Sequence, residues 1–151
     1  MKHYYFAYGM NTNLDSMAQR CPGAFCLGSS QLEGYKFAFR KHADVELGNP
    51  DDKVDGVLWQ LDDMHLNCLD SFEGFPNYYL RCKAWVHCDE IGWVKAWVYT
   101  MEDQDYIAKP SDSYVKMCME GYEQNNVSTK QIISALDEVN ADQDLIESFR
   151  L

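Results

Sequence analysis

The sequence has few cationic side chains relative to its acidic ones. Its 151 residues include 13 Lys and Arg against 24 Asp and Glu, which gives a formal net charge of −11. A field of this sign repels phosphate backbones and anionic lipid, so we expect neither nucleic acid nor a membrane surface as a partner. The acidic residues are scattered along the chain rather than clustered, which is typical of a solvated surface.

Motifs for metal, phosphate and serine chemistry are also missing. The four histidines show no HxxxH or HExxH spacing, Ser29-Ser30 has no GxSxG context, and no glycine-rich phosphate loop occurs. The six cysteines lack paired CxxC spacing, so we expect reduced, mostly buried thiols rather than a disulfide framework. A metal site at Cys82, His87 and Cys88 would need a ligand from a second cluster, which the sequence does not offer. We therefore expect no metal and no cofactor.

The sequence shows no targeting segment, linker or repeat. The aromatic run near the N-terminus is too short, and too polar in its surroundings, for a signal peptide or a membrane span. We therefore expect a cytoplasmic location. Hydrophobic residues make up 46% of the chain, with no low-complexity tract or Gly/Ser-rich stretch. Residues 1–151 are accordingly expected to form a single domain.

The first two thirds of the chain has the composition of β-strands. Aromatic and β-branched residues, several in two-residue alternation, predict strands over residues 3–8, 33–40, 53–61, 78–88 and 92–100. In the last of these, the odd-numbered residues from Trp93 to Tyr99 would share one face, and the even-numbered residues the other. Short strands joined by Gly, Asp and Asn turns predict a small, largely antiparallel β-barrel, with an open α+β sheet as the alternative.

Helical periodicity interrupts the strands and follows them. Apolar spacing predicts a helix over 14–21, with Asn11–Asn13 offering N-cap side chains, and a second helix over 62–72 behind an Asp62 cap. The expected apolar stripe of the second helix comprises Leu61, Met64, His65, Cys68, Leu69 and Phe72. The last third of the chain is predicted to be helical. It includes a helix over 111–122 with an apolar stripe of Val115, Cys118, Met119 and Tyr122, and a capping-box pattern at Ser128 and Gln131.

The first predicted strand ends in Tyr8-Gly9 and runs into the start of a helix. Such a bend presents unpaired backbone N–H groups in front of the positive end of a helix dipole, and it can hold a carboxylate or an oxyanion. Gly9 permits close approach of the backbone, and Asn11–Asn13 add side-chain donors. An ordinary turn carries the same sequence signature and is the alternative interpretation.

Glu73 follows the second predicted helix and precedes Gly74. A carboxylate at a helix C-terminus lies at the unfavourable end of the dipole, and Phe72 and Phe75 are expected to desolvate it, so both effects should raise its pKa. A raised pKa suits a general acid/base that works near neutral pH. A solvated turn glutamate is the alternative. Asp70, one turn earlier, is expected on the outer face of the helix rather than in a carboxylate pair.

The stretches YFAYGMN, DGVLWQL, LDSFEGFPNYYLR and PSDSY, the last followed by MCMEGYEQNNVS, occur in this order. Together they resemble the gamma-glutamylcyclotransferase family along nearly the whole chain. The resemblance implies an α+β fold in which helices wrap a small mixed, largely antiparallel barrel. It also implies release of 5-oxoproline and a free amine or amino acid from a gamma-glutamyl compound. In that reaction the substrate's α-amine attacks its own γ-carbonyl. A glutathione-specific cyclotransferase, or a non-catalytic module that binds a small ligand or a protein, is the alternative.

The family's Tyr-Gly loop and Glu-Gly pair correspond to Tyr8-Gly9 and Glu73-Gly74. By this resemblance Glu73 is the catalytic acid/base. The implied substrate-binding positions are Tyr5, Phe6, Ala7, Tyr8, Gly9, Met10, Asn11, Tyr79 and Tyr114. Met10 replaces the family's usual Ser or Thr, which removes a hydroxyl but keeps the backbone N–H. The expected partner is a small gamma-glutamyl substrate, while the leaving amine and the oligomeric state are left open.

Overall fold

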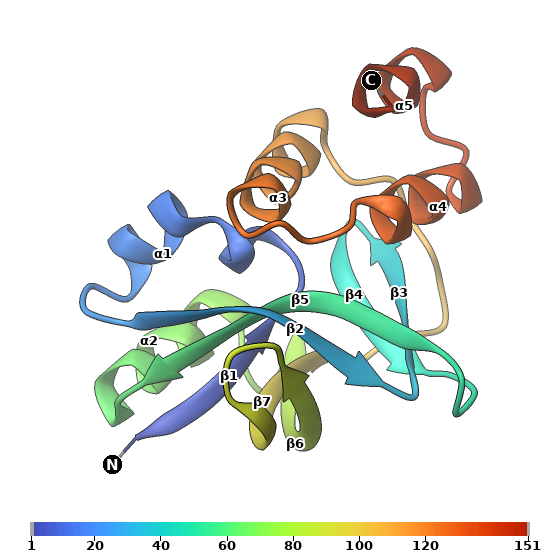
Figure 1. Cartoon of the computed structure of the whole chain (residues 1–151). Helices are drawn as coiled ribbons and strands as arrows, with labels where there is room; N and C mark the ends of the chain where they lie inside the picture. The colour runs from blue at the N-terminus through green and yellow to red at the C-terminus, as the bar shows by residue number, and fades with distance from the viewer. Residues whose placement is uncertain (1, 151) are drawn as a thin grey trace.

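The computed structural model describes residues 2–150, and its centre is a closed five-stranded barrel (Figure 1). The barrel strands are β1 (His3–Ala7), β2 (Phe25–Glu33), β5 (Lys53–Leu61), β6 (Tyr79–Cys88) and β7 (Gly92–Met101). In the order β1-β5-β2-β6-β7 the neighbouring strands are antiparallel, and a parallel contact of Tyr5 in β1 with Trp97 in β7 closes the barrel. The prediction of a mixed, largely antiparallel barrel is therefore confirmed.

Two strands of the fold were not expected from the sequence. These are β2 and the strand β4 (His42–Leu47), which pairs with β3 (Tyr35–Arg40) in a separate two-stranded sheet. Asp44 fixes this hairpin against the barrel. Its Oδ2 accepts a hydrogen bond from Arg40 Nη1 at 2.8 Å, and its Oδ1 accepts from the backbone N–H of Met101 at 2.9 Å. The middle of β4 is thereby held beside the end of β7.

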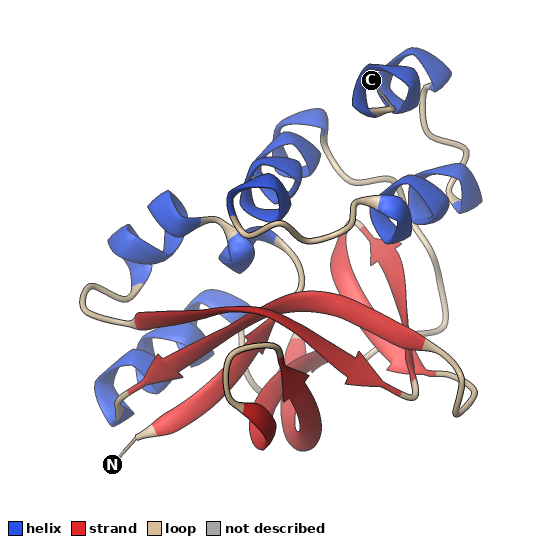
Figure 2. Ribbon diagram, viewed as in Figure 1, coloured by secondary structure: helices blue, strands red, loops and turns tan. Residues whose placement is uncertain are grey.

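The helices surround only part of the barrel. They are the 3₁₀ helix η1 (Met10–Thr12) and the α-helices α1 (Leu14–Arg20), α2 (Asp63–Glu73), α3 (Asp112–Gln124), α4 (Lys130–Glu138) and α5 (Gln143–Phe149). In Figure 2, α1, α3, α4 and α5 gather on one side of the strands, and the β6–β7 hairpin lies on the other. No helix within residues 2–150 has the length and apolar character needed to span a bilayer.

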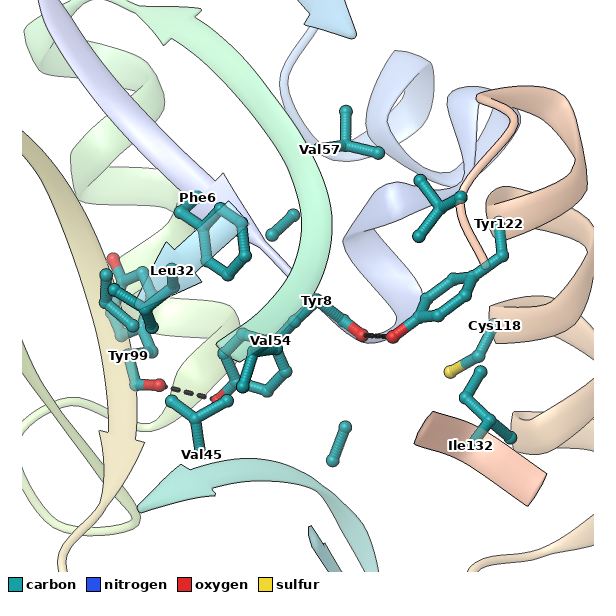
Figure 3. Packing of buried hydrophobic residues seen from close by; sticks show 14 of the residues in the cluster. Phe6, Tyr8, Leu32, Val45, Val54, Val57, Tyr99, Cys118, Tyr122 and Ile132 are labelled. Atoms are coloured by element: carbon teal, nitrogen blue, oxygen red, sulfur yellow. Dashed lines mark hydrogen bonds between the residues drawn. The ribbon is translucent and has the colours of Figure 1, made fainter. Parts of the chain in front are cut away.

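Buried tyrosines join the barrel to α3. Tyr8 follows β1, and its hydroxyl donates to the backbone oxygen of Tyr99 at 2.6 Å. The hydroxyl of Tyr122 in α3 donates in turn to the backbone oxygen of Tyr8 (Figure 3). The apolar stripe predicted for α3, which includes Tyr122, is buried as expected. The strand end at Tyr8 is therefore fixed from two sides, and so is the loop that leaves it.

Two predictions about helices were partly wrong. Asp62 caps α2 as expected. The predicted apolar stripe is only partly correct, because Met64 is 74% exposed and the buried face of the helix is formed by Leu66 and Leu69. The capping box predicted ahead of α4 does not form: the N-cap is Thr129 without a side-chain bond. The Gln131 side chain instead hydrogen-bonds the backbone of Asp55 in β5, because that strand lies beside the helix start.

The expectation for the cysteines was correct in part. All six thiols are free. Cys21, Cys88 and Cys118 are buried, whereas Cys68 and Cys82 are exposed. Cys26 is intermediate, so the expectation of mostly buried thiols is correct for three of the six. Cys68 lies on α2 outside the Leu66 and Leu69 face, and Cys82 is exposed although Val86 and Cys88, on the same face of β6, are buried.

Candidate active site

A cavity of about 170 Å³ lies where β1 runs into η1. It is bounded by the ends of β1, β4, β6 and β7 and by α1, α2 and α3. Its lining residues are Tyr5, Tyr8, Gly9, Met10, Asn11, Arg20, His42, Ala43, Phe72, Glu73, Tyr78, Tyr79, Tyr99 and Tyr114. The Tyr-Gly loop and the Glu-Gly turn, far apart in the sequence, thus meet at one cavity.

Gly9 is required by close packing at the base of the loop. A Cβ at this position would lie 2.9 Å from the Cβ of Ala43 and 2.9 Å from the hydroxyl of Tyr114. Any larger residue would therefore push β4 or α3 away from the loop. The backbone N–H groups of Met10 and Asn11 come next and have no hydrogen-bond partner among the described residues. They supply the free donors that the sequence predicted for this bend.

The Asn11 side chain connects the loop to the other groups of the site. Its Nδ2 donates to the Tyr5 hydroxyl at 3.0 Å and to Glu73 Oε1 at 3.2 Å. Its Oδ1 accepts from Arg20 Nη1 at 2.6 Å, and its backbone oxygen accepts from Trp59 Nε1 at 3.0 Å. Because a guanidinium only donates, Arg20 fixes the amide orientation and turns Nδ2 toward the carboxyl.

Glu73 is the last residue of α2 and lies on the helix face that docks on the barrel. It is one heptad step from Leu66 and one turn from the fully buried Leu69. Gly74 ends the helix in the left-handed conformation, with φ of 67°, which suits glycine. Glu73 therefore lines the cavity because it lies on the face of α2 that packs against the barrel.

The environment of Glu73 favours its neutral form. Burial raises the pKa of the Glu73 carboxyl from 4.5 to about 7, against smaller lowering effects of the Arg20 charge and the Asn11 hydrogen bond. The raised pKa was expected, and burial is its largest cause. Of the two phenylalanines that were expected to desolvate the carboxyl, Phe72 lines the cavity beside Glu73, and Phe75 is not among the lining residues.

Tyrosines form the enclosed part of the cavity. The Tyr79 hydroxyl donates to the backbone oxygen of Ala43 at 2.6 Å, and the Tyr114 hydroxyl accepts from the N–H of the same residue at 3.0 Å. Burial raises the pKa of Tyr5, Tyr79 and Tyr114 above the ordinary value, so these phenols stay neutral. The walls thus offer neutral hydroxyls and aromatic faces around one ionisable carboxyl.

Most of the site residues expected from the sequence meet at this cavity. Phe6 and Ala7 do not line it, because their side chains are packed in the core with 0% and 1% exposure. The substrate contact expected for these two side chains has no support in the lining. Asp70 is likewise outside the cavity lining: its carboxylate binds Arg81 and accepts from the Tyr99 hydroxyl at 2.7 Å.

Several lining residues were missed by sequence reasoning. Arg20, His42, Tyr78 and Tyr99 all contribute to the cavity wall. Tyr78 adjoins Tyr79, and this proximity was the available signal for it. An arginine in the last turn of a helix is ordinary, because it complements the dipole, so Arg20 gave no signal of its own.

The cavity offers carboxyl, amide, guanidinium and hydroxyl groups rather than a metal-ligand set. Within residues 2–150, no group of three His, Cys, Asp or Glu side chains is arranged to hold a metal ion. The chemistry available to the described side chains is proton transfer at Glu73, together with hydrogen bonding by the loop and the tyrosines.

Comparison with known proteins agrees with this arrangement. The family model described as "Gamma-glutamyl cyclotransferase, AIG2-like" matches residues 5–117. A human protein named gamma-glutamylcyclotransferase is 27% identical over 135 residues, which cover 82% of this chain and 71% of that protein. The matched range includes every lining residue of the cavity.

Solved structures share the fold. One titled "Gamma-glutamyl cyclotransferase" has a TM-score of 0.77 at 21% identity and covers 99% of both chains. A yeast gamma-glutamyl cyclotransferase specific to glutathione has a TM-score of 0.63 at 10% identity, covering 98% of this chain and 96% of its own. At these identities the likeness concerns the fold alone. Together with the match over residues 5–117, it places the chain in the gamma-glutamyl cyclotransferase, AIG2-like family of enzymes.

Proposed function

We propose that this protein converts a gamma-glutamyl compound into 5-oxoproline and a free amine, with Glu73 as the acid/base. The observation that carries the proposal is the position of the Glu73 carboxyl in a tyrosine-lined cavity, where burial raises its pKa to about 7. Near neutral pH such a group exists in both protonation states and can both accept and return a proton.

The reaction is an intramolecular transfer of an acyl group. The α-amine nitrogen of the substrate attacks the γ-carbonyl carbon and closes a five-membered lactam. Glu73 accepts a proton from this nitrogen and donates it to the leaving nitrogen as the carbon–nitrogen bond breaks, so the carboxylate is regenerated. Because the nucleophile belongs to the substrate, positioning it accounts for a large share of the rate enhancement.

The cavity walls support this positioning. Met10 and Asn11 line the cavity, and their free N–H groups are available as donors for a substrate carboxylate or for the oxyanion that develops on the γ-carbonyl oxygen. Asn11 Nδ2, at 3.2 Å from Glu73 Oε1, keeps the carboxyl facing the same space. The neutral tyrosine hydroxyls offer hydrogen bonds without adding a competing charge.

The test is 5-oxoproline release by the purified protein from a panel of gamma-glutamyl amino acids, gamma-glutamyl amines and glutathione. We expect release from at least one class, with kcat/KM rising as the pH increases through about 7, because the carboxylate form of Glu73 is the base. A protein that binds members of the panel but releases no 5-oxoproline would instead be a binding module on the same fold.

A further inference from the structure

One lining residue has no role in the proposed reaction so far. Among residues 2–150, Arg20 is the only Lys or Arg side chain that lines the cavity. His42 also lines it, but burial lowers the pKa of its imidazole, so this group is neutral at neutral pH. The permanent positive charge of the cavity wall therefore comes from Arg20, in a protein whose net charge is −11.

The Arg20 guanidinium is held in place by groups that carry no formal charge. Nη1 donates to Asn11 Oδ1 at 2.6 Å, Nη2 contacts Met10 Sδ at 3.3 Å, and Cζ lies 4.8 Å from the centre of the Phe72 ring. None of the ion pairs among the described residues involves Arg20. An amide oxygen and a thioether use few of its five N–H donors.

The guanidinium lies close to the acid/base but does not pair with it. The Asn11 amide stands between them, with Oδ1 toward Arg20 and Nδ2 toward Glu73. In the proposed reaction Glu73 donates to the leaving nitrogen, so that nitrogen must lie within hydrogen-bond distance of the carboxyl. In an amino acid the carboxylate carbon is only two bonds from this nitrogen. The carboxylate is therefore within reach of Arg20, which is separated from Glu73 by the Asn11 amide alone.

The surroundings of Arg20 point to the leaving group rather than the glutamyl half. Phe72, over which the guanidinium stacks, is 57% exposed and marks the open side of the cavity. Tyr5 and Tyr79, with exposures of 4% and 5%, mark the enclosed side. A substrate whose glutamyl chain fills the enclosed side presents its leaving group to the open side, where Arg20 is.

We propose that Arg20 is a specificity-determining residue whose guanidinium binds a carboxylate on the leaving amine. Gamma-glutamyl amino acids are then preferred over gamma-glutamyl amines that lack this carboxylate. The assignment rests on the proposed function. It also gives Met10 a role, since its sulfur contacts Nη2 at the position where the family's usual residue carries a hydroxyl.

The test compares gamma-glutamyl-alanine with gamma-glutamyl-ethylamine, which differ only by the leaving-group carboxylate. For each compound, kcat/KM for 5-oxoproline release is measured in the wild type, Arg20→Gln, Arg20→Lys and the control Arg150→Gln. Arg150 lies on the C-terminal side of α5 and pairs with Glu147. Assays at about pH 9 keep Glu73 ionised in every variant, because loss of the Arg20 charge raises its pKa further.

We expect the wild type to prefer gamma-glutamyl-alanine. Arg20→Gln should lose roughly ten- to a hundredfold in kcat/KM on this compound, the usual cost of removing a hydrogen bond to a charged group, with little change on gamma-glutamyl-ethylamine. Arg20→Lys should recover part of the preference because it keeps the charge, and Arg150→Gln should match the wild type. Thermal melts identify any variant that fails to fold.

Three outcomes would overturn the assignment. Equal losses on both compounds in Arg20→Gln, with Arg20→Lys no better, would show that Arg20 serves the glutamyl half or the Asn11 amide rather than the leaving group. A wild type without a preference for gamma-glutamyl-alanine would also show that Arg20 does not bind the leaving group. A folded wild type that is inert on both compounds and on the wider panel would overturn the proposed function, and this assignment with it.

Discussion

The cavity and the outer face of the β6–β7 hairpin are both rich in aromatic residues, and one face of β7 contributes residues to both regions. Tyr99 and Trp93 both belong to the odd-numbered face of β7, yet Tyr99 is 2% exposed and Trp93 is 52% exposed. The Tyr99 end is covered by α2, since its hydroxyl donates to Asp70 at 2.7 Å. The other end of β7, at the β6–β7 turn, carries no such cover from the described helices (Figure 1).

The partners of the aromatic rings differ in the same way. On the hairpin, cationic side chains lie over the indoles: Lys83 Nζ is 5.0 Å from the Trp97 ring centre, and Lys95 Nζ is 5.7 Å from that of Trp85. In the cavity the tyrosine hydroxyls form hydrogen bonds with backbone groups or with polar side chains, and they surround a carboxyl. One alternating strand pattern therefore produces a desolvated site where a helix covers it and an ordinary charged surface where none does.

The largest expected difference between the two regions concerns catalysis. Glu73→Gln keeps the size of the side chain and much of its hydrogen bonding, but it cannot accept the amine proton. We expect kcat for 5-oxoproline release to fall by about a hundredfold to ten-thousandfold, as is typical when a general acid/base is lost, with a much smaller change in substrate affinity. The matched control is Glu90→Gln in the β6–β7 turn, which should leave kcat unchanged.

Near-wild-type turnover in folded Glu73→Gln would remove Glu73 from the mechanism. An equal loss in Glu90→Gln would instead indicate that the assay reports protein quality rather than chemistry. Thermal melts of both variants separate these cases.

A second difference concerns the dependence of stability on pH. The pKa of Glu73 is raised from 4.5 in the unfolded chain to about 7 in the folded protein, so the protonated carboxyl favours folding. This contribution is complete below pH 4.5 and is lost as the pH rises through about 7. Glu73→Gln stays neutral, so it should gain free energy of unfolding relative to the wild type between pH 5 and 8, by at most about 3 kcal/mol.

Urea denaturation at several pH values measures this gain. Glu90→Gln, which removes an exposed carboxyl from the hairpin turn, should follow the wild-type profile. Parallel profiles for the wild type and Glu73→Gln would show that the carboxyl is well solvated and that the cavity does not raise its pKa.

A smaller difference is expected for single aromatic side chains. Tyr8→Phe removes the hydrogen bond from the buried Tyr8 hydroxyl to the Tyr99 carbonyl and should lower the free energy of unfolding by about 1 kcal/mol. Trp85→Phe changes a residue that is 57% exposed and should change it by less than about 0.5 kcal/mol. Urea denaturation of both variants at one pH measures these changes in the free energy of unfolding. A change in Trp85→Phe as large as that in Tyr8→Phe, or larger, would contradict the contrast between the two regions.

The smallest effect is expected for Met10→Ser. The backbone N–H of Met10 is unchanged, and the thioether is only a weak acceptor for Arg20, which Asn11 and Phe72 also hold. Turnover of the best substrate should stay level or rise. A collapse of turnover with an intact fold would mean that the methionine itself shapes the cavity.

The strands that the sequence did not predict owe their structure to tertiary contacts. In β2, the run Gly28-Ser29-Ser30 has weak β-propensity, and the strand exists because β5 and β6 pair with it on both sides, with an irregularity between Cys26 and Gly28. In β4, Asp44 looks like a turn residue, yet it is fully buried because Arg40 and the Met101 N–H satisfy it. Neither compensation is visible in local sequence.

The site was predictable where local chemistry decided it. A glutamate at the end of an apolar helix and a glycine after a strand are local signals, and Glu73 and Gly9 both line the cavity. Arg20 and His42 depend on which elements meet at the barrel end, and only the folded chain brings them there. Phe6 and Ala7 lie between the lining residues Tyr5 and Tyr8 but are packed in the core, and the family resemblance did not distinguish them from their neighbours.

The parallel contact between β1 and β7 also has a kinetic consequence. These strands are neighbours in the barrel but are remote in the sequence, so closing the barrel between them must overcome a large loop-closure entropy. Tyr5 and Tyr99, which both line the cavity and pack edge to face at 5.8 Å between ring centres, come from these two strands. During refolding, helical signal can therefore return before any substrate can bind, and recovery of ligand binding will time the closure of the barrel.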